Sequence, residues 1–277
     1  MGELLNTTQR SMIGAEFITR TSGKCVVIDY KSGKDMTVAF YNPPYVTKCT
    51  MGNLRTGHVK NPYYPTLYGK GFIGIGTYSS KNRYVYDLWA SMLKRAYSDK
   101  EHTNSPSYKD VEVCEEWFNF QNFAEWCYSQ EFFGVKDDKE RWYELDKDIL
   151  VQGNKTYSPD KCCFVPKEVN LIFVNIACKD SKGSVGVQYI PKIGKFIARV
   201  SFEGKSKYLG SFRDLEDAKK VYENNKRCCF KEVADRWGAK LDERVYIKLK
   251  ELSKHLDIEC SYDKVSNKMK QINLKGV

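Results

Sequence analysis

The sequence predicts an α+β protein of several domains, on three observations. The chain has 277 residues, a length that suggests about two domains and leaves room for a sizeable core. Strand-like apolar runs near the N-terminus give way to helical periodicity from residue 84, and strand-like runs return after residue 186. Charge divides the chain similarly, because residues 1–77 carry a net +5, residues 78–180 a net −4 and residues 181–277 a net +9.

We therefore expect four segments. They are a small β module at residues 1–77, a central helical block with a ββα motif at 78–180, a three-stranded sheet with a helix at 181–240, and a C-terminal helix with a basic tail at 241–277. The net charge is +10. Basic residues concentrated at both ends suit contacts with nucleic-acid phosphates, although lysine-rich surfaces also serve solubility alone.

The first segment contains β-rich runs at residues 16–19, 25–30 and 36–41, separated by Ser-Gly turns. Two prolines after Asn42 end the third run. Two interpretations of this module remain open, an auxiliary DNA clamp and a structural module with a solvated basic face. The clamp would use Arg20, Lys24, Lys48, Arg55 and Lys60.

Gly69, Gly71 and Gly74 match the spacing of the dinucleotide-binding fingerprint. That fingerprint requires a helix that opens inside the motif, and here the next helix cannot begin before about Asn82. We interpret these glycines as a flexible or bulged connection between modules.

From Tyr84 the apolar residues follow a helical period. The stripe consists of Val85, Leu88, Trp89, Met92 and Ala96. A loop through His102, a strand at 111–114 and a second helix at 115–128 follow. We interpret the aromatic residues of these helices as core, and a stacking platform for nucleic-acid bases is the alternative.

Residues 142–173 form the most informative stretch. They predict a strand over 143–149, a turn at Gly153 and Asn154, a second strand ending at Phe164, and a helix that begins at Pro166. Such a ββα arrangement can bring Asp146 of the first strand against Asn170 of the helix. Two oxygen ligands of this kind, with room for water and phosphate, suit a Mg²⁺-dependent nuclease site.

The same stretch resembles the HNH (ββα-metal) endonucleases of bacteriophages. The resemblance rests on Leu145-Asp146-Lys147-Asp148, Gly153-Asn154, Tyr157-Ser158-Pro159, Cys163-Phe164-Val165-Pro166 and Asn170, and on the preceding block from Tyr86 to Trp126. It covers about 90 residues and implies hydrolysis of phosphodiester bonds with Mg²⁺ or Mn²⁺. It also implies that Asp146 and Asn170 are the metal ligands.

The chain departs from this family at the general base, because Lys147 stands where histidine is common. A lysine is protonated near neutral pH and cannot accept a proton unless its pKa is strongly lowered. We expect Lys147 to contact the phosphate or the leaving group. Tyr157 or a metal-bound water would provide the nucleophilic step, and Asp148 and Asn154 would support the turn.

Ten cysteines are present without any C-x-x-C pair, which favours reduced, buried thiols. Some HNH relatives carry structural zinc, and the candidates here are Cys114, Cys127, Cys162 and Cys163; we do not expect zinc at them. No signal peptide or membrane-spanning run is visible. We expect the protein to be located in the cytoplasm of the bacterial host cell.

After a polar linker at 179–184, two strands at 195–202 and 205–212 are joined by Glu203-Gly204, and a helix with Asp214 as its N-cap follows. This segment resembles the Apetala/ethylene-response-factor DNA-binding domain through its G-K-F-x-A-R-V and G-K-x-K-Y-L-G-x-F runs. The resemblance implies a three-stranded sheet in the major groove of DNA. The implied DNA-facing residues are Lys192, Lys195, Arg199, Lys205, Lys207 and Arg213.

Arg199 is the expected base reader in this set, because a guanidinium can pair bidentately with guanine. An unspecific basic ββα unit is the alternative. A further helix is expected at 243–256, followed by a frayed tail at 261–277.

The sequence thus predicts a phage-type DNA endonuclease, of the homing or nicking kind, that acts on double-stranded DNA. Two alternatives remain: a DNA-binding regulator or host-takeover factor with a degenerate nuclease site, and a protein whose basic ends bind an acidic host protein. The sequence leaves open whether the protein is a monomer or a dimer.

Overall fold

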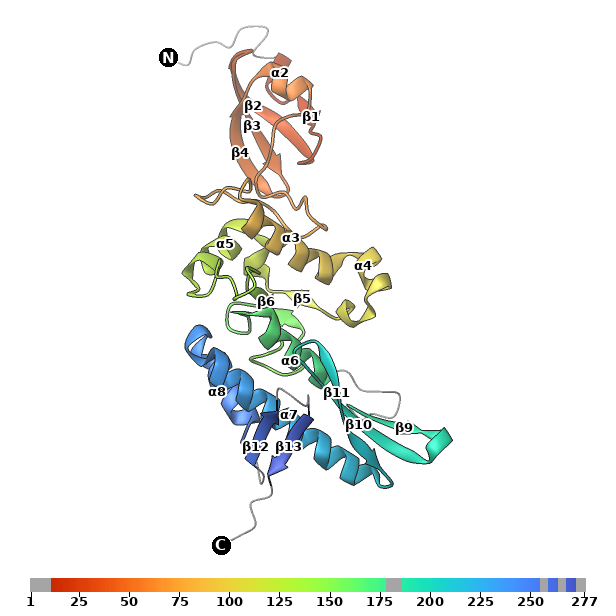
Figure 1. The fold of residues 1–277 in the computed structure, drawn as a ribbon. Coiled ribbons are helices and arrows are strands. Elements are labelled where there is room, and N and C mark those ends of the chain that lie inside the picture. Colours follow the sequence, from red (N-terminus) through yellow and green to blue (C-terminus); the bar gives the residue numbers. More distant parts are fainter. Residues whose placement is uncertain (1–10, 178–185, 255–258, 264–267, 273–277) are drawn as a thin grey trace. The chain divides into compact units, whose positions relative to one another are not determined.

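The structure, a computed structural model, describes residues 11–177, 186–254, 259–263 and 268–272 (Figure 1). Its architecture is mixed α+β, as predicted. A four-stranded antiparallel sheet lies near the N-terminus, a helical region with small sheets follows, and a three-stranded sheet precedes a long helix.

The chain divides into two compact units, which are described separately below. The N-terminal unit comprises Met1–Ser129 and Thr156–Ser158, and the C-terminal unit comprises Gln130–Lys155 and Pro159–Val277. The three boundaries predicted between the four segments stay predictions.

The N-terminal sheet has the order β1-β2-β3-β4. Its strands are β1 (Glu16–Ile18), β2 (Lys24–Ser32), β3 (Asp35–Tyr41) and β4 (Pro44–Cys49), and a short helix α2 (Met51–Arg55) follows. The three predicted strands are confirmed. β4 and α2 were not predicted; the prolines end β3, but the chain then turns back and pairs along β3. One face of this sheet packs with α2 into a core that includes Val27, Val38, Phe40 and Leu54.

The helical region contains α3 (Arg83–Tyr97), α4 (Asp99–Asn104) and α5 (Phe120–Ser129). The predicted stripe is confirmed, since Val85, Trp89, Met92 and Ala96 are buried. The prediction of a loop at His102 is wrong, because helix α4 includes this residue. The Ser98 hydroxyl accepts a hydrogen bond from the Glu101 backbone and caps this helix.

Two 3-10 turns, at Pro106–Tyr108 and Glu115–Phe118, lie between α4 and α5. The second turn takes the place of the first residues of the helix expected at 115–128. The short strand β5 (Glu112–Val113) pairs in parallel with β7 (Thr156–Tyr157).

The glycine-rich segment packs closely against the helical region. A Cβ at Gly71 would clash with Leu93 and lie 2.9 Å from Trp89 Cζ2, while a Cβ at Gly74 would meet Asn119. The next helix, α3, starts only at Arg83. Gly71 and Gly74 therefore allow close packing of the backbone, which is a role beyond the flexible or bulged connection expected.

The C-terminal unit begins with β6 (Glu144–Asp146), β8 (Cys163–Val165) and α6 (Lys167–Ala177). It continues with β9 (Val187–Ile190), a 3-10 turn (Pro191–Ile193), β10 (Lys195–Phe202), β11 (Lys205–Phe212) and α7 (Leu215–Trp237). A 3-10 turn (Gly238–Lys240), α8 (Glu243–Leu252), β12 (Glu259–Asp263) and β13 (Lys268–Ile272) complete it.

One core unites α6, β10 and α7, because Val169 and Ile172 of α6, Val200 of β10 and Val233 of α7 belong to the same buried cluster. Asp214 caps α7 through hydrogen bonds from the backbone of Glu216 and Asp217, as predicted. Although α7 has 23 residues, no helix among the described residues is long and apolar enough to cross a membrane.

The C-terminal end of the chain differs from the prediction in one respect. Residues 259–263 and 268–272 form the antiparallel pair β12–β13, in which Ser261 lies opposite Lys270. The expectation of a frayed tail is therefore wrong for these strands, because backbone pairing between them replaces contact with water. The expected end of the preceding helix at residue 256 lies outside the described residues.

The cysteines occur in more than one state. Free thiols are found at Cys25, Cys49, Cys114, Cys127, Cys162, Cys163 and Cys229. Cys228 is disulfide-bonded. Cys178 lies outside the described residues.

Candidate functional site

The C-terminal unit contains a ββα unit formed by β6, β8 and α6. β6 and β8 are antiparallel, with Glu144 opposite Val165 and Asp146 opposite Cys163. Because side chains alternate along a strand, Glu144 and Asp146 lie on one face of β6 and the buried Leu145 on the other.

Asp146 holds the turn that follows β6. Its Oδ1 accepts hydrogen bonds from the backbone N–H groups of Asp148 (2.7 Å) and Ile149 (2.8 Å). Its Oδ2 receives no hydrogen bond from the described residues. Burial raises the pKa of the Asp146 carboxyl, although the two N–H bonds act in the opposite direction. A desolvated carboxylate with one unused oxygen suits a cation.

Asn170 connects α6 to the same face of β6. Its Nδ2 donates to Glu144 Oε2 at 2.8 Å. Its Oδ1 is buried and has no hydrogen-bond partner among the described residues. A buried polar oxygen without a partner is uncommon, and an ordered water or a cation would satisfy it.

The sequence reasoning missed Glu144. The available signal was its position two residues before Asp146 on the same strand, which places both carboxylates on one face. Glu144, Asp146 and Asn170 together offer two carboxylates and one amide oxygen, the hard oxygen ligands that Mg²⁺ and Mn²⁺ accept. The oxygen atoms of Asp146 and Asn170 are thus of the chemical type that a divalent cation accepts, and Glu144 holds the Asn170 amide.

Lys147 is buried in the turn, with 6% of its surface exposed. Its Nζ lies 2.8 Å from both carboxylate oxygens of Asp148 and 3.2 Å from the backbone oxygen of Asn154. Asn154 Nδ2 in turn donates to the Lys147 backbone oxygen at 2.8 Å. In this arrangement the Lys147 ammonium holds the turn together.

Tyr157 belongs to the N-terminal unit, whereas Asp146, Lys147 and Asn170 belong to the C-terminal unit. The Tyr157 side chain is buried, and Arg95 Nη1 lies 3.4 Å from its hydroxyl oxygen. Its backbone is fixed by the parallel pairing of β7 with β5.

The described histidines also lie in the N-terminal unit. His58 Nδ1 contacts Thr56 Oγ1 at 2.8 Å, and His102 Nε2 contacts the backbone oxygen of Arg95 at 3.0 Å. His255 lies outside the described residues. The described part of the C-terminal unit thus contains no imidazole that could act as a general base.

The four cysteines considered for zinc are divided between the two units. Cys114 and Cys127 lie in the N-terminal unit, and Cys162 and Cys163 in the C-terminal unit. Burial raises the pKa of the Cys163 thiol well above its ordinary value, and the neighbouring Asp146 adds to this effect. Among the residues that the structure describes, no three His, Cys, Asp or Glu side chains gather as a metal site.

The three-stranded sheet has the order β11-β10-β9 and two different faces. On β10, Ala198, Val200 and Phe202 are buried in the core with α7, whereas Arg199 and Ser201 are exposed. The predicted division of β10 into an apolar and a polar face is therefore confirmed.

A β-bulge between Ala198 and Arg199 determines the exposed face on β11. After the bulge, Arg199 lies opposite Tyr208, and Val200 lies opposite Lys207. Tyr208 is consequently exposed, and Lys207 lies buried on the helix side with its ammonium 4.6 Å from the centre of the Phe202 ring.

The remaining predicted DNA-contacting residues lie at or near the surface. Lys192, Arg199, Lys205 and Arg213 are exposed, and Lys195 is half-buried. Of the six predicted residues, Lys207 alone is buried among the core side chains.

Comparisons with known protein families, with curated proteins and with solved structures found no match for this chain.

Proposed function

We propose that this chain is a metal-dependent DNA endonuclease of the HNH type. The observation that carries the proposal is the buried, unpartnered Oδ1 of Asn170 on α6, whose Nδ2 donates to Glu144 on the strand that also carries Asp146. The expectation from the sequence motif supports the same assignment.

In this proposal Asp146 and Asn170 hold the cation, and Glu144 positions the Asn170 amide through its hydrogen bond. A bound Mg²⁺ or Mn²⁺ would neutralise charge that develops on the scissile phosphate and activate a water molecule. Lys147, Asp148 and Asn154 keep the turn beside Asp146 in place. Lys147 acts here through the turn rather than on the phosphate.

The exposed face of the three-stranded sheet would contact double-stranded DNA. Arg199 would pair bidentately with guanine, and the exposed Tyr208 lies opposite it across the strands. Lys192, Lys195, Lys205 and Arg213 would contact phosphates.

A second candidate is a DNA-binding protein that does not cut. The observation that favours it is the burial of Lys147 at the position where the HNH family has its histidine. A buried ammonium paired with Asp148 is poorly suited to accept a proton. Such a protein would act as a regulator or as a host-takeover factor.

Nicking of supercoiled DNA in Mg²⁺ or Mn²⁺ separates these candidates. We expect the wild-type protein to nick, and Asp146→Ala and Asn170→Ala to lose activity by at least about a hundredfold. Asp235→Asn is the matched control, because it removes an exposed carboxylate from α7. DNA binding without nicking by the wild type would establish the second candidate, and equal nicking by Asp146→Ala would reject the proposed centre.

A further inference from the structure

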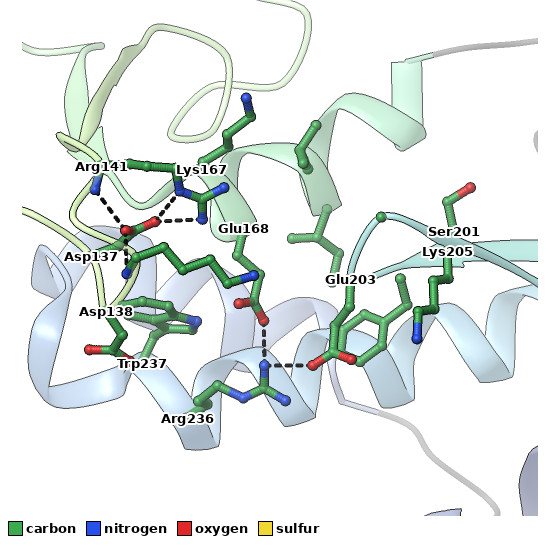
Figure 2. A pocket seen from close by; sticks show the side chains of 15 residues that line it. Asp137, Asp138, Arg141, Lys167, Glu168, Ser201, Glu203, Lys205, Arg236 and Trp237 are labelled. Carbon is green, nitrogen blue, oxygen red and sulfur yellow. Dashed lines mark hydrogen bonds and ion pairs between the residues drawn. The ribbon is translucent and has the colours of Figure 1, made fainter. Parts of the chain in front are cut away.

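A cleft of about 720 Å³ lies within the C-terminal unit, and neither Asp146 nor Asn170 belongs to its lining. It is lined by residues 137–141, the start of α6, the turn between β10 and β11, and the end of α7 (Figure 2). This volume lies in the range of small-ligand sites.

The acidic groups of the cleft have cationic partners. Arg236 Nη1 lies 2.6 Å from Glu168 Oε1 and 2.8 Å from Glu203 Oε1, and Figure 2 shows the guanidinium between the two carboxylates. Asp137 accepts a hydrogen bond from Arg141 Nε at 2.7 Å. Asp138 pairs with a lysine, Lys240, at 3.2 Å.

Three lysines of the lining, unlike these acids, form no ion pair within the described residues. Lys139, Lys167 and Lys205 are exposed, and none of them has an acidic partner within the described residues. Their positive charge is therefore available to an anion that enters the cleft.

One wall supplies a second, independent indication of a ligand. Trp237 is 4% exposed, and its Nε1 is buried without a hydrogen-bond partner among the described residues. An indole N–H can only donate, so the missing partner must be an acceptor. An oxygen of a bound molecule would satisfy it.

The apolar part of the lining comes from Leu171, Ile172 and Phe202. Leu171 is 44% exposed, so its side chain is accessible to a ligand. An anion that also carries an apolar, flat part matches this combination of side chains better than a bare inorganic ion.

We propose that the cleft binds a nucleoside phosphate, with the phosphate at the lysines and the sugar and base against the apolar lining. The ligand is either a free nucleotide or a nucleotide within a single strand. This inference relies on the proposed DNA function only for the choice of a nucleic-acid ligand.

Calorimetric titration of the full-length protein tests the proposal with three probes: nucleoside monophosphates, a short single-stranded oligonucleotide and inorganic phosphate. We expect Lys139→Gln combined with Lys167→Gln to weaken binding of the monophosphates at least about tenfold. Lys220→Gln removes an exposed lysine of α7 outside the cleft and should leave binding unchanged.

Trp237→Phe keeps an aromatic ring and removes the N–H donor, so it should also weaken binding. If Trp237→Phe lowers the melting temperature strongly, the result of Lys139→Gln combined with Lys167→Gln decides whether the proposal holds. Binding of the oligonucleotide alone, with the same dependence on the lysines, would support the proposal and identify a strand as the ligand.

The proposal is overturned if no probe binds, if inorganic phosphate binds as tightly as the nucleotides, or if the lysine pair has no effect. Arg199→Gln separates the cleft from the proposed DNA interface, because it should weaken duplex binding and leave monophosphate binding unchanged. Monophosphate binding in a protein that fails to bind duplex DNA would reject the proposed function and preserve the cleft.

Discussion

Two side-chain oxygens, Asp146 Oδ2 and Asn170 Oδ1, have no hydrogen-bond partner in the described part of the chain. The other polar atom of each side chain has a structural contact. Asp146 Oδ1 caps a turn, and Asn170 Nδ2 donates to Glu144. Each residue thus has one structural contact and one unused oxygen. At the residue scale, substitutions that preserve the structural contact can isolate the proposed role in metal binding.

Asp146→Asn is such a substitution, because the amide oxygen can still accept the N–H bonds of Asp148 and Ile149. Burial raises the pKa of Asp146, so desolvation makes its charged form costlier in the folded protein than a neutral amide would be. We therefore expect the variant to be at least as stable as the wild type without metal. Thermal denaturation with and without Mg²⁺ or Mn²⁺ should show a metal-dependent rise in Tm for the wild type only.

Asp235→Asn serves as the control for that experiment and should keep the metal-dependent rise. An equal rise in Asp146→Asn would show that the ion binds elsewhere.

Lys226 provides a prediction about pH. Burial lowers the pKa of its ammonium to about 8, and its Nζ donates to the Ile172 backbone oxygen at 2.8 Å. Between pH 8 and 10.5 the unfolded chain binds this proton and the folded chain has released it, so the free energy of unfolding rises with pH. The rise from this group amounts to about 3 kcal/mol.

Urea denaturation of wild type and Lys226→Met at pH 7 to 10 measures this effect. Methionine does not titrate, so the stability of the wild type relative to the variant should increase as the pH rises. Lys220→Met, at an exposed position of α7, should show no such trend. Parallel stability profiles for wild type and Lys226→Met would contradict the lowered pKa.

At the scale of elements, a β-bulge in β11, where Leu209 is passed over in the register with β10, decides which residues of β11 face solvent. Without the shift between Ala198 and Arg199, the regular alternation would place Lys207 outward and Tyr208 inward, because a one-residue change of register exchanges the two faces. The bulge reverses this arrangement. The sheet therefore presents Arg199 and Tyr208 together, and Lys207 stacks on Phe202.

The salt dependence of duplex binding tests this face. Each lysine that contacts a phosphate contributes about 0.9 to the slope of log affinity against log salt concentration. Lys192→Gln should reduce the slope by about 1. Lys207→Gln should leave the slope unchanged, provided that circular dichroism shows a folded protein, and a smaller slope in this variant would place Lys207 on the DNA.

At the scale of the whole molecule, each compact unit has its own hydrophobic core. The cluster around Val27, Val38 and Phe40 belongs to the N-terminal unit, and the cluster around Val200 and Val233 belongs to the C-terminal unit. Local stability can differ between such units, and hydrogen exchange detects the difference.

Gly71→Ala should destabilise the N-terminal unit by about 1–3 kcal/mol, because the added methyl group overlaps Leu93 and crowds Trp89. Hydrogen exchange followed by mass spectrometry should show faster exchange in α3 and unchanged exchange in α7. Gly33→Ala is the control, since its methyl group would make only an ordinary contact with Met51. An equal loss of protection in both helices would mean that the two units unfold together.

The sequence by itself determined the features that depend on near neighbours along the chain. The stripe of α3, the Asp214 cap and the alternating faces of β10 follow from the helical period, from a side chain that reaches its own backbone, and from the pleat of a strand. Each involves residues a few positions apart. The α+β class follows from the same local patterns.

Tertiary structure alone decided the contacts between distant residues. The bond between Asn170 and Glu144 joins positions 26 residues apart, so no local pattern could indicate it. The burial of Lys207 depends on the register of β11 against the neighbouring strand β10, and the burial of Lys147 depends on the folding back of Asn154. The cleft likewise arises where α6, the β10–β11 turn and α7 meet, because only the packed chain brings Lys139, Lys167 and Trp237 to one place.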